Sequence, residues 1–101
     1  MKNKKVTLQE CKDILITAVE GGINHWADVT EYDHKKGVAM IHKERRTTGM
    51  VITAHMIKEA IPAFVYYANS HMRPDFDLSD IDSELADAII QFIRFGGVVY
   101  S

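Results

Sequence analysis

The chain has one cysteine, Cys11, in 101 residues, and this scarcity excludes two ways of holding a small protein together. One thiol cannot close an intrachain disulfide, and it cannot supply the several thiolates of a structural zinc site. The hydrophobic core must therefore provide the stability, and a reducing compartment, the cytoplasm of a host cell, is the expected location. Cys11 falls on the apolar side of a predicted helix, where a thiol is usually inert packing.

Long apolar runs and an excess of either charge are also missing. No window approaches the roughly 18 consecutive apolar residues of a membrane span, and the lysines near the start are not followed by the apolar segment of a signal peptide. The 12 Lys and Arg oppose 14 Asp and Glu, for a net charge of −2. The sequence therefore predicts no membrane association and does not favour nucleic acid as a partner.

Catalytic signatures are absent as well. The sequence has no phosphate-binding glycine loop, no nucleophile elbow and no dinucleotide fingerprint. Its five histidines are scattered and form no His-x3-His or Glu-x2-His pair on a predicted helix, so neither a metal nor another cofactor is predicted. Glu20 and His25 are the pair best suited to acid–base work, and a small enzyme built on them is the weakest functional alternative. A protein that is not an enzyme is the expectation.

Local signals predict a helix over residues 8–20. Thr7 and Glu10 form a capping box, in which each side chain satisfies a backbone amide of the other residue. The apolar residues that follow recur at helical spacing. The pair Gly21-Gly22 is expected to end this helix in a left-handed turn.

A second helix is expected over residues 54–70, with Thr53 as its cap. Pro62 lies inside this range and removes one backbone donor. We therefore expect the helix to be kinked or divided near Ala60.

A third helix is expected over residues 82–94, after a loop at residues 71–80. Ser79 or Asp80 is expected to cap it, and acidic side chains near its start favour the positive end of the helix dipole.

Four segments have the composition of strands. Residues 23–32 and 38–42 flank a polar connection and predict a hairpin, while residues 50–53 and 98–100 predict short additional strands, the last able to pair with the hairpin. No repeat or linker interrupts the chain, which favours one domain over residues 1–101. The expected fold class is α+β, with a small antiparallel sheet, a hairpin plus one or two short strands, packed on one face against three helices.

The most distinctive segment is Glu20-Gly21-Gly22-Ile23-Asn24-His25-Trp26, where the first helix passes into the first strand. In the structural interpretation the two glycines allow a sharp turn, and the only tryptophan anchors a small core. In the functional interpretation the indole stacks on a planar ligand, such as a nucleotide, while the neighbouring asparagine reads the ligand's edge. The predicted ligand-binding residues are Asn24, His25, Trp26, Arg73 and Tyr100.

Six carboxylates gather near the start of the third predicted helix: Asp75, Asp77, Asp80, Asp82, Glu84 and Asp87. Their spacing lacks the glycine and the final bidentate acid of an EF-hand loop, so calcium is not predicted. A solvated acidic helix start is the structural interpretation. The functional one is a surface that binds a partner protein through Asp75, Asp77, Asp80, Asp82 and Glu84.

The segments 20–26 and 87–100, which cover about a fifth of the chain, carry a resemblance. The pattern Glu-Gly-Gly-x-Asn-x-Trp, taken with a closing Phe-Gly-x-Val-Val-Tyr, resembles that of small uncharacterised proteins encoded by phages, prophages and related mobile elements. The resemblance implies an accessory role, of which inhibition of host defence is one form. It transfers no catalytic residues.

Two functional hypotheses follow. The leading one is a phage-type accessory protein, expected to be a homo-oligomer, that binds and occupies a host macromolecule. The alternative is a protein that sequesters a small nucleotide-like signal in the pocket defined above. Both favour binding over catalysis.

Overall fold

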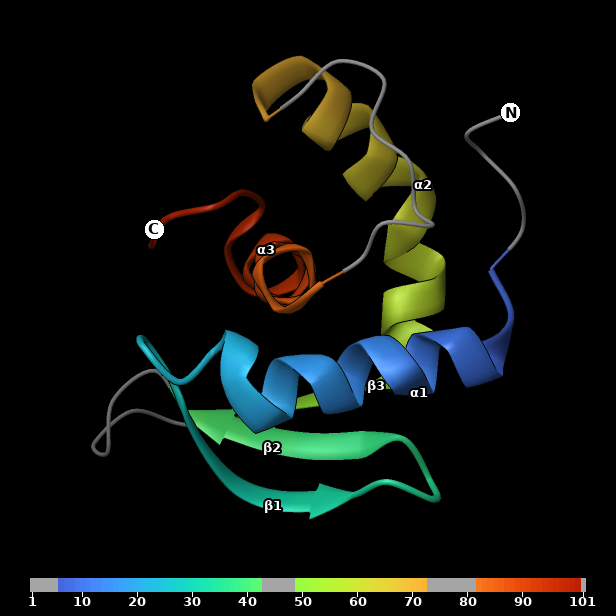
Figure 1. The fold of residues 1–101 in the computed structure, drawn as a ribbon, viewed down its shortest axis with the longest axis vertical. Helices are drawn as coiled ribbons and strands as arrows, with labels where there is room; N and C mark the ends of the chain where they lie inside the picture. The colour runs from blue at the N-terminus through green and yellow to red at the C-terminus, as the bar shows by residue number, and fades with distance from the viewer. Residues whose placement is uncertain (1–5, 43–48, 73–81, 101) are drawn as a thin grey trace.

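The structure, a computed structural model, describes residues 6–42, 49–72 and 82–100, and it has the expected α+β class. Figure 1 shows the helices gathered on one side of a three-stranded antiparallel sheet, so that α1 lies against the sheet and α3 lies between α1 and the upper part of α2. The elements in chain order are α1 (Leu8–Thr17), the π-helical turn η1 (Ala18–Gly22), β1 (Asp28–Asp33), β2 (Val38–His42), β3 (Met50–Thr53), α2 (Ala54–His71) and α3 (Ser83–Phe95).

The first helix begins as its capping box predicts. The backbone N–H of Thr7 donates to Glu10 Oε1 at 2.9 Å, and the N–H of Glu10 donates to Thr7 Oγ1 at 3.1 Å. The helical turns continue through η1 to Gly22, two residues beyond the expected end. The expected left-handed turn at Gly21-Gly22 is wrong, because the described glycines with positive φ are Gly37 and Gly96.

Gly22 has a different role, which is to let η1 approach α3. A Cβ atom at this position would lie 2.6 Å from the backbone carbonyl oxygen of Ser83 and 3.4 Å from Cβ of Asp87. Real Cβ atoms do not approach a backbone oxygen this closely. The absence of a side chain therefore allows the glycine-rich segment and the start of α3 to pack together.

The predicted strand over residues 23–32 is wrong in its first half. The chain makes a tight turn instead, with the N–H groups of Trp26 and Ala27 both donating to the Ile23 carbonyl, and β1 begins at Asp28. Ile23, Trp26 and Ala27 are all buried. Their apolar and aromatic character therefore reflects burial of the turn in the core.

The sheet has strand order β1-β2-β3, and its two faces differ. Ala39, Ile41 and Ile52 are buried against the helices. A bulge between Val29 and Glu31 in β1 adds one residue and keeps both flanking segments in register with β2.

The helix α2 is continuous through Pro62, so the expected division near Ala60 is wrong. Its cap at Thr53 is confirmed, since Thr53 Oγ1 accepts from the Met56 N–H at 3.1 Å. Pro62 lies on the exposed side, where water can satisfy a carbonyl that loses its donor. Figure 1 shows that the axis of α2 bends along its length, as the proline predicts.

The helix α3 begins one residue later than expected and has a different cap. Asp82 Oδ1 accepts from the Leu85 N–H at 2.9 Å, which makes Asp82 the N-cap. The two expected caps, Ser79 and Asp80, lie outside the described residues. Gly96, with φ of 81°, ends the helix in the left-handed conformation.

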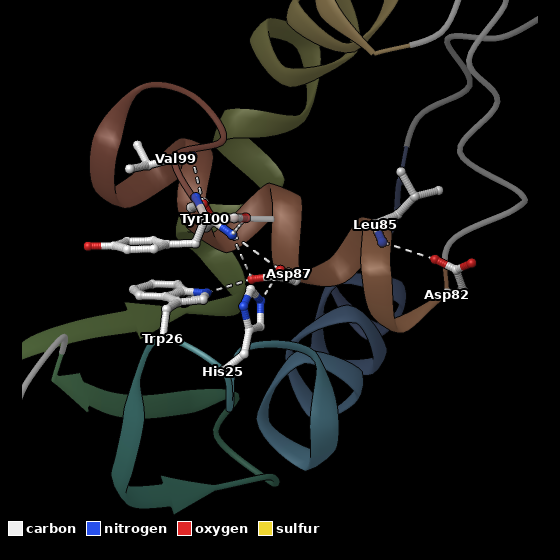
Figure 2. Close-up of polar contacts among 8 residues, drawn as sticks. His25, Trp26, Asp82, Leu85, Asp87, Val99 and Tyr100 are labelled. Carbon is white, nitrogen blue, oxygen red and sulfur yellow. Dashed lines mark hydrogen bonds and ion pairs between the residues drawn. The ribbon is translucent and has the colours of Figure 1, made fainter.

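The expected closing strand over residues 98–100 is wrong. The backbone N–H groups of Val99 and Tyr100 both donate to the side-chain oxygen of Gln91, at 2.8 Å each, in place of a neighbouring strand. The tail therefore folds back onto α3 and is held by one buried amide side chain (Figure 2).

Within the described ranges no helix is both long enough and apolar enough to cross a membrane. The core instead lies between the helices and the inner sheet face, where Leu15, Ile52 and Phe64 are fully buried.

Cys11 belongs to this core and is fully buried. Burial raises the pKa of its thiol above the ordinary value, while the charge of Lys58 lowers the pKa and that of Glu10 raises it. The raised pKa disfavours the reactive thiolate, and burial shields the sulfur from reagents. We expect a thiol reagent to label the native protein roughly 1,000-fold more slowly than the protein in denaturant, because labelling requires opening of the core. Equal rates in the two states would contradict this placement.

Candidate functional site

A buried carboxylate, that of Asp87, joins the Glu20–Trp26 segment to α3. The indole Nε1–H of Trp26 donates to Asp87 Oδ1 at 2.6 Å, and Nε2 of His25 lies 2.8 Å from Asp87 Oδ2. Figure 2 shows both side chains pointing at Asp87 from the turn that follows η1. The Asp87 side chain is 11% exposed, whereas that of His25 is 41% exposed. The imidazole thus links a buried anion to the surface.

Gln91, one turn after Asp87, completes the cluster. Its side-chain nitrogen donates to both carboxylate oxygens of Asp87, at 3.1 and 3.2 Å, and to the Tyr100 carbonyl oxygen at 2.8 Å. Gln91 is fully buried, and its oxygen accepts the two tail amides. The helix α3 therefore positions both Asp87, which accepts the indole N–H, and Gln91, which holds the tail.

The rings of Trp26 and Tyr100 lie parallel, with centroids 5.8 Å apart and an interplanar angle of 4°. The ring of Phe95 packs against both at centroid distances of 5.3 and 5.9 Å. Trp26 is 7% exposed, and its N–H is occupied by Asp87. The structural interpretation of Trp26 holds, and the geometry leaves no open indole face on which a planar ligand can stack.

A surface pocket of about 420 Å³ lies beside this cluster. That volume is within the range of small-molecule sites, about 300 to 1,000 Å³. Carboxylate, imidazole, aromatic and thioether groups are all present in it. Its lining residues are Gly21, Gly22, His25, Met72, Ser83, Glu84, Asp87, Ala88, Val98 and Tyr100.

The structure brings together some of the predicted site residues and separates others. His25, Tyr100 and Glu84 share the pocket, although Glu84 is predicted for a different surface. Asn24 is exposed and does not line the pocket. Asp82 serves as a helix cap. Arg73, Asp75, Asp77 and Asp80 lie outside the described residues.

The pairing of Glu20 with His25 is not what the structure shows. His25 bonds to Asp87, and Glu20 is exposed in the middle of η1. Burial raises the pKa of Tyr32, and the charge of Glu20 raises it further, which places that carboxylate near the sheet.

Among the described residues no group of three His, Cys, Asp or Glu side chains is arranged to hold a metal ion.

Gln91 was not predicted as a functional residue, and the expectation that Asp87 belongs to a solvated acidic helix start is wrong, because both side chains are buried. Both interrupt a continuous apolar stretch of α3, in which Ala86, Ile89 and Ile90 are buried. Polar residues four apart on such a helix face each other and are expected to be paired when buried. The four-residue spacing of Asp87 and Gln91 was therefore the sequence feature that could have predicted this buried polar pair.

A second candidate surface is the side of the sheet opposite the described helices, here called the outer sheet face. The strand register aligns Glu31 with Met40 and Met40 with Val51 across it, and Asp33 with Val38 in the next row. Val51 is 43% exposed. A shallow pocket of about 450 Å³ lies here, lined by Glu31, Tyr32, Asp33, Val38, Met40 and Val51.

Comparisons with protein-family models, with curated proteins and with solved structures find no match to this chain.

Proposed function

We propose that the protein is a non-enzymatic accessory protein of phage type that binds and occupies a host protein, with a component of host defence as the expected target. The outer sheet face is the surface that carries this proposal. It is built on three paired strands, and on it Val51, which is 43% exposed, lies beside the half-buried Val38 and Met40.

The chemistry of the outer sheet face defines the partner. The outward positions of β1 are acidic at Asp28, Glu31 and Asp33, whereas the neighbouring positions of β2 and β3 include the apolar Val38, Met40 and Val51. Exposed apolar patches beside polar residues are typical of protein interfaces. The complementary partner therefore presents an apolar patch bordered by lysine or arginine, which the acidic strand steers into place.

The geometry of the polar cluster favours binding over catalysis. Asp87 accepts hydrogen bonds from Trp26 and Gln91, and its Oδ2 atom lies within hydrogen-bond distance of Nε2 of His25. These contacts join the turn after η1 to α3. An acid–base pair engaged in structural bonds is poorly placed to move protons to a substrate. The alternative of a nucleotide-sequestering protein has weaker support, because carboxylates line the pocket where a phosphate would have to bind.

A matched pair of variants at Val51 tests the proposal. Tagged wild-type protein and the variants Val51→Thr and Val51→Glu are used to capture proteins from a bacterial host lysate at low and moderate salt. Threonine keeps the β-branched shape, so we expect the partner to be recovered as by wild type. Glutamate places a charge in the apolar row, so we expect recovery to fall by about tenfold or more.

Two measurements make the outcome decisive. Thermal unfolding of each variant, followed by circular dichroism, shows that the fold is intact. Capture of the same partner by Val51→Glu and by wild type would contradict the outer sheet face as the binding surface. Reproducible absence of any captured partner at both salt concentrations would contradict the proposed function itself.

A further inference from the structure

The pocket beside Asp87 combines negative charge with apolar walls. Glu84 and Asp87 contribute two carboxylates from the first turns of α3. Among the described lining residues there is no lysine or arginine, and the one side chain able to carry positive charge is His25, whose Nε2 lies 2.8 Å from Asp87 Oδ2. Met72, Val98 and Tyr100 contribute apolar and aromatic surface. Its lining residues come from η1, the turn after it, the end of α2, α3 and the tail, and none of them belongs to a strand of the sheet.

We propose that this pocket binds a small organic cation, an amine or amidinium carried on a compact apolar body. The positive group lies at the carboxylates of Glu84 and Asp87, and the body lies against Met72, Val98 and Tyr100. This inference is independent of the proposed function, since it rests on different residues.

The two carboxylates differ in a way that suits this ligand. Asp87 is fixed by its bonds to Trp26 and Gln91, so it presents its charge at a set position in the wall. Glu84 is exposed, and its side chain can rotate to meet the cation. A planar amidinium matches a carboxylate with two parallel hydrogen bonds.

The aromatic ring of Tyr100 adds a second reason to expect a cation. Its position is fixed by stacking on Trp26 and by the bonds of its backbone to Gln91. The negative face of an aromatic ring attracts a cation within about 6 Å of its centre. The thioether of Met72 is polarisable and fits an apolar body of irregular shape.

The charge also selects against the ligand that the sequence analysis considered. A nucleotide would bring phosphate close to the two carboxylates, and this repulsion is strongest where the pocket excludes water. The single arginine predicted to balance it, Arg73, lies outside the described residues. The described walls therefore favour a cation over an anion of similar size.

Three probes of nearly equal shape test the charge preference. Benzamidine is a cation, benzamide is neutral and benzoate is an anion, and each is titrated into the full-length protein by isothermal calorimetry and by fluorescence of Trp26. We expect saturable binding of benzamidine with a Kd of roughly 1 mM, as suits a ligand of this size. Benzamide and benzoate should bind at least about tenfold more weakly.

A pair of charge-neutralising variants locates the site. Glu84→Gln should weaken benzamidine binding by about fivefold or more, because it removes the exposed carboxylate at constant shape. Glu59→Gln removes an exposed carboxylate on α2 that does not line the pocket, and it should leave the Kd unchanged. Raising the salt concentration should weaken wild-type binding and have less effect on Glu84→Gln.

Several results would overturn the inference. Benzoate or adenosine monophosphate binding as tightly as benzamidine would show that the pocket does not select a cation. An unchanged Kd in Glu84→Gln would show that the cation binds elsewhere. The Val51→Glu variant should bind benzamidine as wild type does, so loss of the host partner and loss of the cation are separate outcomes.

Discussion

Replacing Gly22 by alanine should lower the free energy of unfolding by about 2–3 kcal/mol. The added Cβ would lie 2.6 Å from the Ser83 carbonyl oxygen, and that oxygen belongs to the backbone of α3. Backbone cannot rotate away as a side chain can, so η1 and α3 must separate. For a domain of about 100 residues this loss corresponds to a fall in Tm of roughly 10 °C or more, measured by circular dichroism.

The neighbouring glycine supplies the control. A Cβ at Gly21 would meet nothing within 4 Å, and this residue is exposed. Alanine there restricts the unfolded chain without a clash, so Gly21→Ala should be neutral or stabilise the protein by up to about 1 kcal/mol. Equal destabilisation by the two substitutions would show that η1 needs glycine for its backbone conformation and not for its contact with α3.

The contrast between these two glycines shows where sequence reasoning reached its limit. A pair of glycines after an amphipathic stretch is typical of a helix end. The pattern therefore predicts that both glycines are needed for the backbone conformation of a turn. The requirement at Gly22 comes from Ser83, which is 61 positions away in the chain. Contacts of this kind have no local pattern in one sequence.

Features determined by neighbouring residues were predictable. The caps at Thr7 and Thr53 are local hydrogen bonds between residues three apart, and both are present. The strands β2 and β3 and the α+β class follow from short-range pattern and composition. Of the kink or division expected near Ala60, the division is wrong, because one missing bond on the exposed side is a small cost for a helix whose other side is buried.

The errors concern segments whose partners lie far along the chain. Residues 23–27 have strand composition but form a buried turn, and residues 98–100 bond to the Gln91 side chain. Trp26 and Tyr100 were both predicted to line one ligand-binding surface. Their rings do lie together, but Trp26 is buried there and bonds to Asp87. The sequence indicated the right neighbourhood, and only the fold distinguished packing residues from pocket residues.

Replacing Asp87 by alanine should destabilise the protein by about 3–5 kcal/mol, the largest effect that we predict. The substitution leaves the indole N–H of Trp26 and the amide of Gln91 buried without their acceptor. Denaturant unfolding followed by the fluorescence of Trp26, the only tryptophan, measures the loss. Faster hydrogen exchange at the amides of Val99 and Tyr100 should accompany it, because Gln91 loses the partner that orients it.

Two further substitutions separate the buried role of Asp87 from its charge. Glu84→Ala removes an exposed carboxylate three residues earlier in α3, and it should cost no more than about 0.5 kcal/mol. Asp87→Asn keeps one oxygen for Trp26, and its amide can face His25 if that ring accepts at Nε2, so it should cost less than Asp87→Ala. Similar losses for Asp87→Ala and Glu84→Ala would contradict a structural carboxylate.

A double-mutant cycle identifies the bond responsible. Trp26→Phe removes the indole N–H while keeping an aromatic ring in the core, and the resulting protein is followed by circular dichroism. Once Asp87 is alanine, that N–H has no acceptor to lose, so Trp26→Phe should cost about 1–3 kcal/mol less than in wild type. Additive losses would mean that the 2.6 Å contact contributes little and that Asp87 acts through Gln91 and the tail. The cycle thus distinguishes a carboxylate that anchors the core from one that fastens the closing segment.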